Sequence, residues 1–267
     1  MPKKNRLDLH LLTKGLVDSR QKAQQLIRAG MVKDRNGTIL DKPGMPVSID
    51  LEIEIKKSDR FVSRGGEKLL AAIEAFQISL LGRVCLDCGI STGGFTDCLL
   101  QNGASLVYGI DVGYGQTAWS IRNDPKVILK ERTNIRYLKP EDIYAQQDQF
   151  ADFAVADLSF ISLKLVLPVI KSLLKPEHQE ALILVKPQFE IGKDKVGKGG
   201  VVRDLKDHLT VLNSIVEFSL STGWEVQGVI PSPLRGAAGN QEYLVWLKVN
   251  GLRALPDLEI LIKNALD

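Results

Sequence analysis

From residue 83 onward, apolar segments of strand length alternate with stretches that have helical periodicity. This alternation is typical of an α/β fold in which helices cover both faces of a doubly wound, mostly parallel sheet. Seven strands are expected, at 83–87, 106–111, 127–130, 153–157, 181–186, 224–230 and 243–249. Helices are expected near 66–77, 94–102, 114–122, 162–174, 205–221 and 256–265.

The first of these strands runs into a glycine-rich turn that has the pattern D-x-G-x-x-x-G-G. Dinucleotide enzymes instead use G-x-G-x-x-G to bring a pyrophosphate to a helix N-terminus. An acid at the start of the turn suits a ligand with a cationic amino-acid end, such as S-adenosylmethionine, and disfavours a pyrophosphate. The alternative is a tight turn that needs its glycines only for backbone geometry. The candidate cofactor residues of the turn are Asp87, Gly89, Ser91, Thr92, Gly93, Gly94 and Phe95.

Further candidates for the cofactor site follow the next strands. Asp111 ends the second strand about 20 residues after the turn, where an acidic side chain accepts hydrogen bonds from a ribose diol. Asn134 follows the third strand, at the sheet edge where an adenine is expected. Asp157 ends the fourth strand and completes the predicted cofactor site.

Two apolar strands stop at a single charged residue, Asp157 in one and Lys186 in the other. Such residues meet at the carboxyl edge of a parallel sheet, beside the point where a cofactor binds. Together with S-R-G-G-E-K before the first strand and G-N-Q-E-Y before the last, this pattern resembles the FtsJ-type ribose methyltransferases. The resemblance implies a Rossmann-like sheet of seven strands and a catalytic set of Lys68, Asp157, Lys186 and Glu242.

This set suits the methylation of a ribose 2′-hydroxyl, which is a poor nucleophile until its proton is withdrawn. Lys186 is the hypothesised proton acceptor, and Lys68 is expected to hold the hydroxyl and stabilise developing negative charge. Asp157 and Glu242 would orient the two lysines. This chemistry requires no metal.

A small basic module precedes the sheet. Residues 18–30 have a capping residue, helical spacing of apolar side chains and a terminal glycine, which predict a short helix. Segments 31–33 and 38–40 flank Asn36-Gly37 and suit a hairpin, and further strands are expected at 46–49 and 51–55. Through R-L-D, S-R-x-x-A and I-R-x-G-x-V, residues 5–56 resemble the RNA-binding domain named after ribosomal protein S4.

The full set of motifs closely resembles the TlyA haemolysin-type rRNA methyltransferases over nearly the whole chain. The resemblance implies ribosomal RNA as substrate, modified at a cytidine ribose. Three parts are predicted: an RNA-binding domain of the α+β class at 1–56, a linker at 57–62 and a methyltransferase domain at 63–267. The candidate RNA-binding residues are Arg6, Arg20, Lys22, Arg28, Lys33, Arg64, Lys193 and Lys198.

Charge and composition restrict the classes of function that the chain can have. Residues 1–60 hold 13 Lys and Arg against 8 Asp and Glu, whereas the remainder holds 22 against 24. No apolar run of transmembrane length and no secretory signal stands out, so a cytoplasmic protein that acts as a monomer on ribosomal subunits is expected. Cys85, Cys88 and Cys98 are expected to be buried thiols, and the three scattered histidines leave no zinc site.

Four rival functions remain open. They are a membrane-acting haemolysin, a pseudouridine synthase, an NAD-dependent oxidoreductase and a catalytically silent ribosome-binding module. The glycine spacing disfavours the oxidoreductase, and a pseudouridine synthase would leave the glycine-rich turn unexplained. Trp119, Trp224 and Trp246 are expected in the core rather than as stacking platforms.

Overall fold

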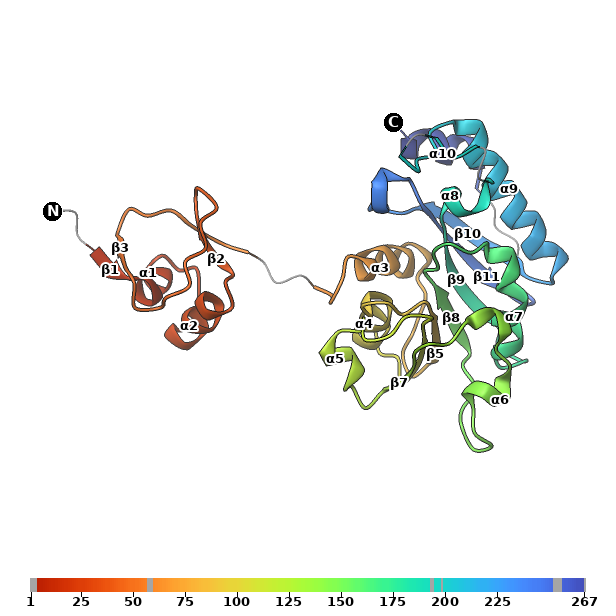
Figure 1. Cartoon of the computed structure of the whole chain (residues 1–267), viewed down its shortest axis with the longest axis horizontal. Helices are drawn as coiled ribbons and strands as arrows, with labels where there is room; N and C mark the ends of the chain where they lie inside the picture. Colours follow the sequence, from red (N-terminus) through yellow and green to blue (C-terminus); the bar gives the residue numbers. More distant parts are fainter. Residues whose placement is uncertain (1–3, 57–59, 193–194, 198, 252–255, 267) are drawn as a thin grey trace. The chain divides into compact units, whose positions relative to one another are not determined.

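The computed structural model describes residues 4–56, 60–192, 195–197, 199–251 and 256–266. The chain divides into two compact units, with the boundary before Arg60. Figure 1 shows an N-terminal unit of short helices and strands and a second unit built around one large sheet. Each unit has its own hydrophobic core.

The second unit is an α/β domain with a seven-stranded sheet in the order β10-β11-β9-β8-β5-β6-β7. The strands from β5 to β9 pair in parallel, whereas β11 is antiparallel to both of its neighbours. The predicted fold class is therefore confirmed, and the structure adds that the last strand runs in the opposite direction. The strands are β5 (Val84–Cys88), β6 (Leu106–Ile110), β7 (Val127–Lys130), β8 (Phe153–Ala156), β9 (Glu180–Val185), β10 (Glu225–Pro231) and β11 (Tyr243–Lys248).

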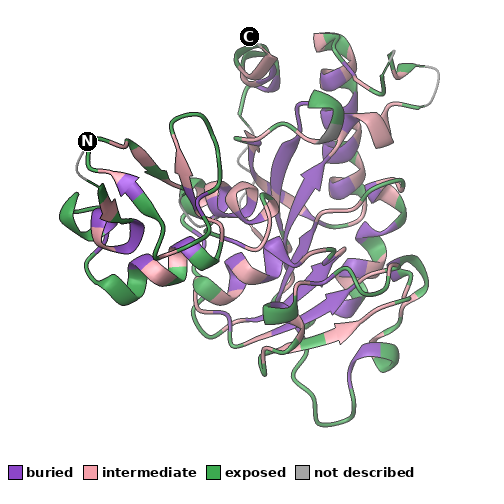
Figure 2. Cartoon of the chain, turned by 60° about the vertical axis from the view of Figure 1, so that its left-hand side comes forward, coloured by how far each residue is buried: buried purple, intermediate pink, exposed green. Residues whose placement is uncertain are grey.

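Helices cover both faces of this sheet, because the strands bury side chains on both sides (Figure 2). One face packs against α3 (Gly65–Phe76) and α4 (Gly94–Gln101). The other packs against α7 (Leu167–Leu173), α9 (Leu205–Ser221) and α10 (Leu258–Leu266). Shorter helices are α5 (Trp119–Arg122), α6 (Pro140–Ile143), α8 (Pro187–Glu190), η1 (Ile135–Tyr137), η2 (Leu163–Leu165) and η4 (Ala237–Gly239).

The chain order of the strands fixes where a ligand can bind. The chain moves outward from β5 through β6 to β7 and then returns to β8, which pairs with the other side of β5. This reversal is a topological switch point, where loops diverge and leave a crevice outside the carboxyl ends of the strands. The crevice lies at the ends of β5 and β8.

Two expectations for this unit were wrong in detail. The helix expected at 114–122 begins only at Trp119, because glycines at 113 and 115 interrupt the preceding segment. Trp119 is 80% exposed rather than in the core, whereas Trp224 is fully buried and Trp246 is half-buried. Cys85, Cys88 and Cys98 are free and buried, as expected.

The N-terminal unit packs α1 (Leu7–Thr13) and α2 (Arg20–Arg28) against two small antiparallel sheets. Ser19 caps α2 by accepting a hydrogen bond from the Lys22 backbone N–H at 3.2 Å, as its sequence predicts. Helix α1 was missed because its N-cap residue, Arg6, makes no side-chain cap. The strands are β1 (Lys4–Arg6), β2 (Val32–Asp34), β3 (Pro46–Ser48) and β4 (Ile53–Ile55).

The hairpin expected around Asn36-Gly37 is reduced to one bridge between Lys33 and Ile39. The Asp34 carboxylate accepts the backbone N–H groups of Asn36 and Thr38, which closes the turn locally. Strand β2 then pairs with β4, so the sheet partner comes from a more distant segment. Among the described residues, no helix is long and apolar enough to span a membrane.

Candidate active site

The turn between β5 and α4 approaches the end of β8 closely, and this approach depends on glycine. Gly89 has φ +95°, and a Cβ at this position would lie 2.9 Å from the Asp157 backbone oxygen. A Cβ on Gly94 would lie 2.1 Å from Ser63 Oγ, so only glycine lets the start of α4 meet the segment that leads into α3. These two glycines bring the residues around Asp157 and Ser63 to the same crevice.

Asp87, expected to contact the cofactor, belongs to strand β5 directly before the turn. Its side chain is fully buried and borders neither of the two cavities described below. Thr96 Oγ1 donates to Asp87 Oδ2 at 2.7 Å, while Asp87 Oδ1 has no hydrogen-bond partner among the described residues. Burial raises the pKa of Asp87 to about 7, and the neighbouring carboxylates of Asp157 and Asp111 add to the shift. The structure supports a role in holding the turn.

This buried carboxyl makes stability depend on pH. Because the folded-state pKa of Asp87 is above its ordinary value, the folded protein binds the proton more tightly than the unfolded chain. Its contribution to stability is therefore full below about pH 4 and is lost as the pH rises through about 7. We expect urea unfolding to show that wild type loses stability relative to Asp87→Asn between pH 5 and pH 8. A difference independent of pH would contradict this assignment.

A cavity of about 750 Å³ lies along the carboxyl ends of β5, β6 and β8. Its walls combine apolar side chains, including Ile110 and Ile135, with Asp111 and Asn134. The two Asp111 carboxylate oxygens each accept a backbone N–H at 2.7 Å, one from Ser91 and the other from Gly113. Asp111 is thereby fixed at the cavity wall with further lone pairs available.

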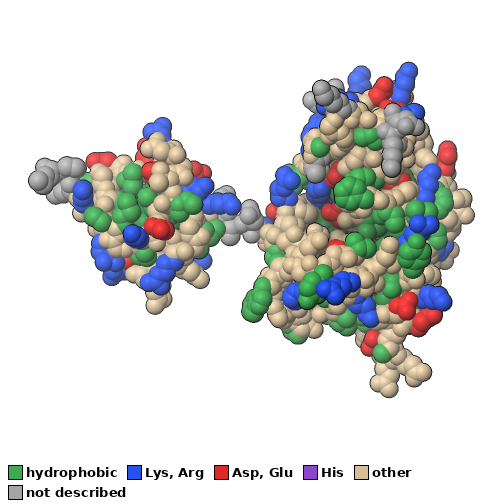
Figure 3. All heavy atoms as spheres, viewed as in Figure 1, with side chains coloured by type: hydrophobic (Ala, Val, Ile, Leu, Met, Phe, Trp, Pro, Cys, Tyr) green, Lys and Arg blue, Asp and Glu red, His purple; other side chains and the backbone are tan. Residues whose placement is uncertain are grey.

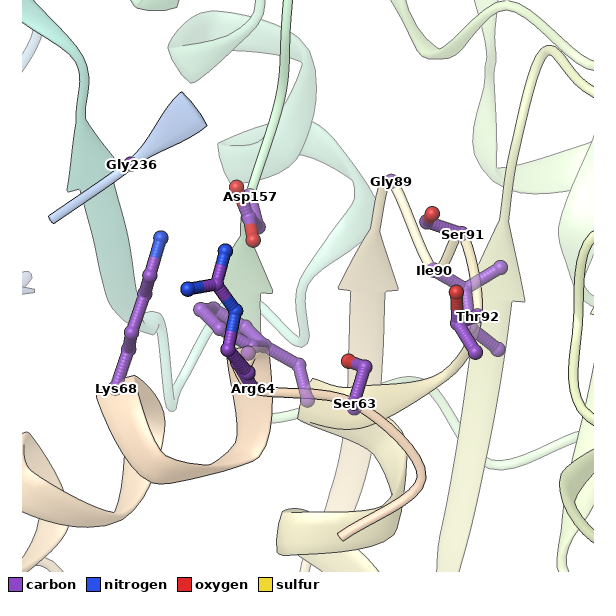
Figure 4. Close-up of a pocket in the computed structure, with 12 residues that line it drawn as sticks. Ser63, Arg64, Lys68, Gly89, Ile90, Ser91, Thr92, Asp157 and Gly236 are labelled. Atoms are coloured by element: carbon purple, nitrogen blue, oxygen red, sulfur yellow. The ribbon is translucent and has the colours of Figure 1, made fainter. Parts of the chain in front are cut away.

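A smaller cavity of about 220 Å³ shares the wall residues Gly89, Ser91 and Asp157 with the larger one. Figure 4 shows the side chains of Lys68, Arg64 and Asp157 pointing toward the same space. The predicted site residues Thr92, Gly94 and Phe95 also line it. The shared wall makes the two cavities adjoining compartments of one site.

The four charged residues form two ion pairs at this point. Lys68 Nζ lies 2.5 Å from Glu242 Oε2, and Lys186 Nζ lies 2.6 Å from Asp157 Oδ1. Their side chains are largely buried, with exposed fractions of 11% and 2% in the first pair and 12% and 24% in the second. Lys68 and Asp157 line the small cavity directly, and Glu242 and Lys186 each form an ion pair with one of these two lining residues.

The reversed direction of β11 brings Glu242 to this edge. Tyr243 pairs with Val185 at the end of the β11–β9 ladder, so Glu242 and Lys186 occupy the next positions on the two strands. Gly236, which lines the small cavity, has no side chain, and a Cβ there would overlap the Glu242 carboxylate at 2.0 Å. The carboxylate therefore reaches Lys68 across the space that glycine leaves open.

Other predicted residues are placed as follows. Gly93 is the buried N-cap residue of α4 in the turn itself, and it lines neither cavity. Arg6, Arg20, Lys22, Arg28 and Lys33 lie in the N-terminal unit, where all but the half-buried Lys33 are exposed. Lys193 and Lys198 lie outside the described residues. Residues that line the cavities but were not among the sequence-predicted site residues include Ser63, Gln116, Arg136 and Phe160.

Phe160 is the most unusual of the missed residues. It is 91% exposed, adopts φ +65° and lies at the rim of the large cavity. Its ring centroid is 5.0 Å from that of Phe189. A bulky residue rarely adopts a positive φ, and such strain is often stored at functional sites. Its place in the loop after a parallel strand was a sequence signal that could have identified it.

The sheet and crevice define a Rossmann-like S-adenosylmethionine-dependent methyltransferase. The chain belongs to the FtsJ-like methyltransferase family, which matches residues 61–249, and it carries an S4 domain at residues 5–53. The resemblance inferred from the motifs is thereby confirmed, and the chain is an enzyme that uses S-adenosylmethionine.

Individual relatives agree over most of their length. The chain is 46% identical to the 16S/23S rRNA (cytidine-2′-O)-methyltransferase TlyA of Mycobacterium tuberculosis, covering 96% of this chain and 94% of that protein. It is 39% identical to Hemolysin A of Brachyspira hyodysenteriae, covering 90% and 98%. A solved structure from Streptococcus thermophilus, described as a hemolysin, has 38% identity and a TM-score of 0.73, with coverage of 99% and 96%.

Proposed function

We propose that this protein transfers a methyl group from S-adenosylmethionine to the 2′-hydroxyl of a cytidine in ribosomal RNA. The observation that supports this most is the convergence of Lys68–Glu242 and Lys186–Asp157 beside a cavity large enough for a nucleoside. The relative from M. tuberculosis is named for this activity. The spacing of the glycines in the turn after β5 disfavours a dehydrogenase.

The large cavity suits S-adenosylmethionine chemically. Its apolar walls fit a heteroaromatic base, and Asp111 at the end of β6 can accept hydrogen bonds from a ribose diol. Asn134 lines the same cavity. Its side-chain Oδ1 accepts a hydrogen bond from the Arg136 backbone N–H at 3.0 Å, which fixes the orientation of the Asn134 side chain. When bound, S-adenosylmethionine supplies an electrophilic methyl group on a sulfonium.

The charged residues divide the remaining work. After the Lys186 ammonium has released a proton to solvent, its neutral amine accepts the ribose proton, and Asp157 and Ser159 fix this amino group, at 2.6 and 3.0 Å from Nζ. Lys68 faces the small cavity, where its ammonium group stabilises negative charge that develops on the ribose oxygen. Glu242 holds Lys68 in this position. Among the described residues, no three His, Cys, Asp or Glu side chains form a group that could hold a metal.

The RNA enters over a positively charged and aromatic rim. Figure 3 shows Lys and Arg side chains around the hollow of the second unit and on the N-terminal unit. Arg64, which lines the small cavity, is exposed and can reach a phosphate. The S4 domain supplies further contacts to the RNA. The protein acts in the cytoplasm, and a single copy of it binds a ribosomal subunit.

Phe160 is expected to stack on an unpaired base. Phe160→Ala should raise KM for ribosomal subunits by about tenfold, since one base–aromatic contact contributes about 1–3 kcal/mol. Stability should be unchanged, because the ring is 91% exposed. Steady-state methylation kinetics measure this, with Leu81→Ala as the control, since Leu81 is also exposed but precedes β5 at the opposite sheet edge. Equal KM values in both variants would refute the stacking role.

The function itself is tested by mapping 2′-O-methylated ribose with mass spectrometry. Ribosomal subunits from cells that lack the protein are incubated with the purified protein and S-adenosylmethionine. We expect a new methyl group on a cytidine ribose, and a methylated base or an unmodified RNA would overturn the proposal. Lysis of erythrocyte ghosts by the same preparation tests the haemolysin alternative, for which we expect no lysis.

A further inference from the structure

A buried carboxylate organises the N-terminal unit. Asp8 is fully buried on α1, yet its two oxygens accept five hydrogen bonds. Arg6 donates to both oxygens, from Nε at 3.0 Å and from Nη2 at 2.9 Å. Arg20 Nε and Gln24 Nε2 add bonds at 3.0 and 2.9 Å, and the Leu9 N–H adds one at 3.0 Å. A buried charge needs such a complete set of partners to remain ionised.

Asp8 draws together two arginines from different elements. Arg6 ends β1 and Arg20 begins α2. Arg6 Nη2 and Arg20 Nε lie within about 6 Å of each other, because each is within 3.0 Å of the same Asp8 oxygen, Oδ2. Their side chains are 48% and 49% exposed, so each guanidinium has one edge on the carboxylate and another toward solvent.

The outer edges of both guanidinium groups have spare donors. In the hydrogen bonds of the described residues, Arg6 uses Nε and Nη2 and Arg20 uses Nε only. Arg6 Nη1 and both Nη atoms of Arg20 therefore remain for another acceptor. Two positive charges against one carboxylate leave the cluster with a net charge of about +1, which an anion would balance. A phosphate oxygen matches this geometry, because guanidinium groups bind phosphates through paired N–H bonds.

We propose that Asp8 is the positioning residue of a phosphate site, in which Arg6 and Arg20 together bind one phosphate group of the RNA backbone. The proposal rests on the proposed function, because it names how the N-terminal unit holds its RNA. Hydrogen bonding by Arg6 keeps the pKa of Asp8 well below its usual range, so the carboxylate stays ionised wherever RNA is bound. Without Asp8, the two arginines would repel each other and lose their shared orientation.

The test is a double-mutant cycle in the full-length protein. Binding to deproteinised ribosomal RNA is measured by filter binding between about 50 and about 300 mM KCl, for wild type, Asp8→Asn, Arg20→Ala and the double variant. We expect Asp8→Asn and Arg20→Ala each to weaken binding about tenfold and to reduce the slope of log K against log salt by about 1. In the Asp8→Asn background, Arg20→Ala should have little further effect.

Two controls separate positioning from loss of structure. Gln24→Ala removes one hydrogen bond to the same carboxylate without removing a charge, so its RNA affinity should stay close to that of wild type. If Asp8→Asn does not fold, Arg6→Lys and Arg20→Lys retain Asp8 and the positive charges but remove the forked donors. We expect both lysine variants to bind RNA weakly.

The outcomes distinguish this inference from the function on which it rests. If Arg20→Ala weakens binding equally with and without Asp8, or if both lysine variants bind like wild type, the positioning role is wrong. Methylation of ribosomal subunits by wild type would then still support the proposed function. If wild type neither binds nor methylates ribosomal RNA, the function itself fails.

Discussion

Replacing Lys186 with arginine is expected to reduce methyl transfer by about a thousandfold, within the range that a positioned base contributes. Arginine keeps the positive charge beside Asp157, whose Oδ1 lies 2.6 Å from Lys186 Nζ, but it cannot give up its proton to become a base. Because Lys186 acts on the ribose proton and does not line the larger cavity that suits S-adenosylmethionine, affinity for S-adenosylmethionine should be unchanged. Single-turnover methylation of ribosomal subunits and titration calorimetry with S-adenosylmethionine measure the two quantities.

The matched control is Lys171→Arg. Lys171 lies on α7, and its amino group donates to the backbone oxygens of Thr222 and Gly223, away from the crevice. Its methylation rate should equal that of wild type. Wild-type turnover by Lys186→Arg would remove Lys186 from the mechanism, and lost cofactor affinity would instead indicate a role in binding.

Replacing Glu242 with methionine is expected to lower both stability and activity. The change leaves the Lys68 ammonium, whose side chain is only 11% exposed, without its partner at 2.5 Å. Removal of one member of a buried ion pair typically costs about 3 kcal/mol or more of unfolding free energy. Methylation should fall by about a hundredfold or more, because Lys68 is no longer held at the small cavity. Urea unfolding and the methylation assay report the two effects.

A second substitution separates these two effects. Adding Lys68→Met removes the unpaired charge, so the double variant should recover to within about 1 kcal/mol of wild-type stability. Its activity should remain lost, because the ammonium group is absent. If activity returns with stability, the pair serves folding alone and has no part in the reaction.

Much of the fold could be predicted because the information lies in local sequence. Apolar runs and helical periodicity placed all seven strands of the large sheet within about two residues, and α9 coincides with the predicted helix at 205–221. Short elements without such signals, including α1 and α8, were missed. The ends of β8 and β9 also identified Asp157 and Lys186, since parallel strands bring their carboxyl ends to one edge.

The sequence by itself therefore determined the fold class, the glycine-rich turn and the types of residue that gather at the crevice. Only the tertiary structure decided that Lys68 pairs with Glu242, that Asp87 is fully buried and that Trp119 is exposed. Periodicity reports which side chains avoid water, but it carries no information about partners distant along the chain. Those partners come together only in the folded domain, where β11 runs antiparallel to its neighbours, α3 lies close to α4 and the core is buried.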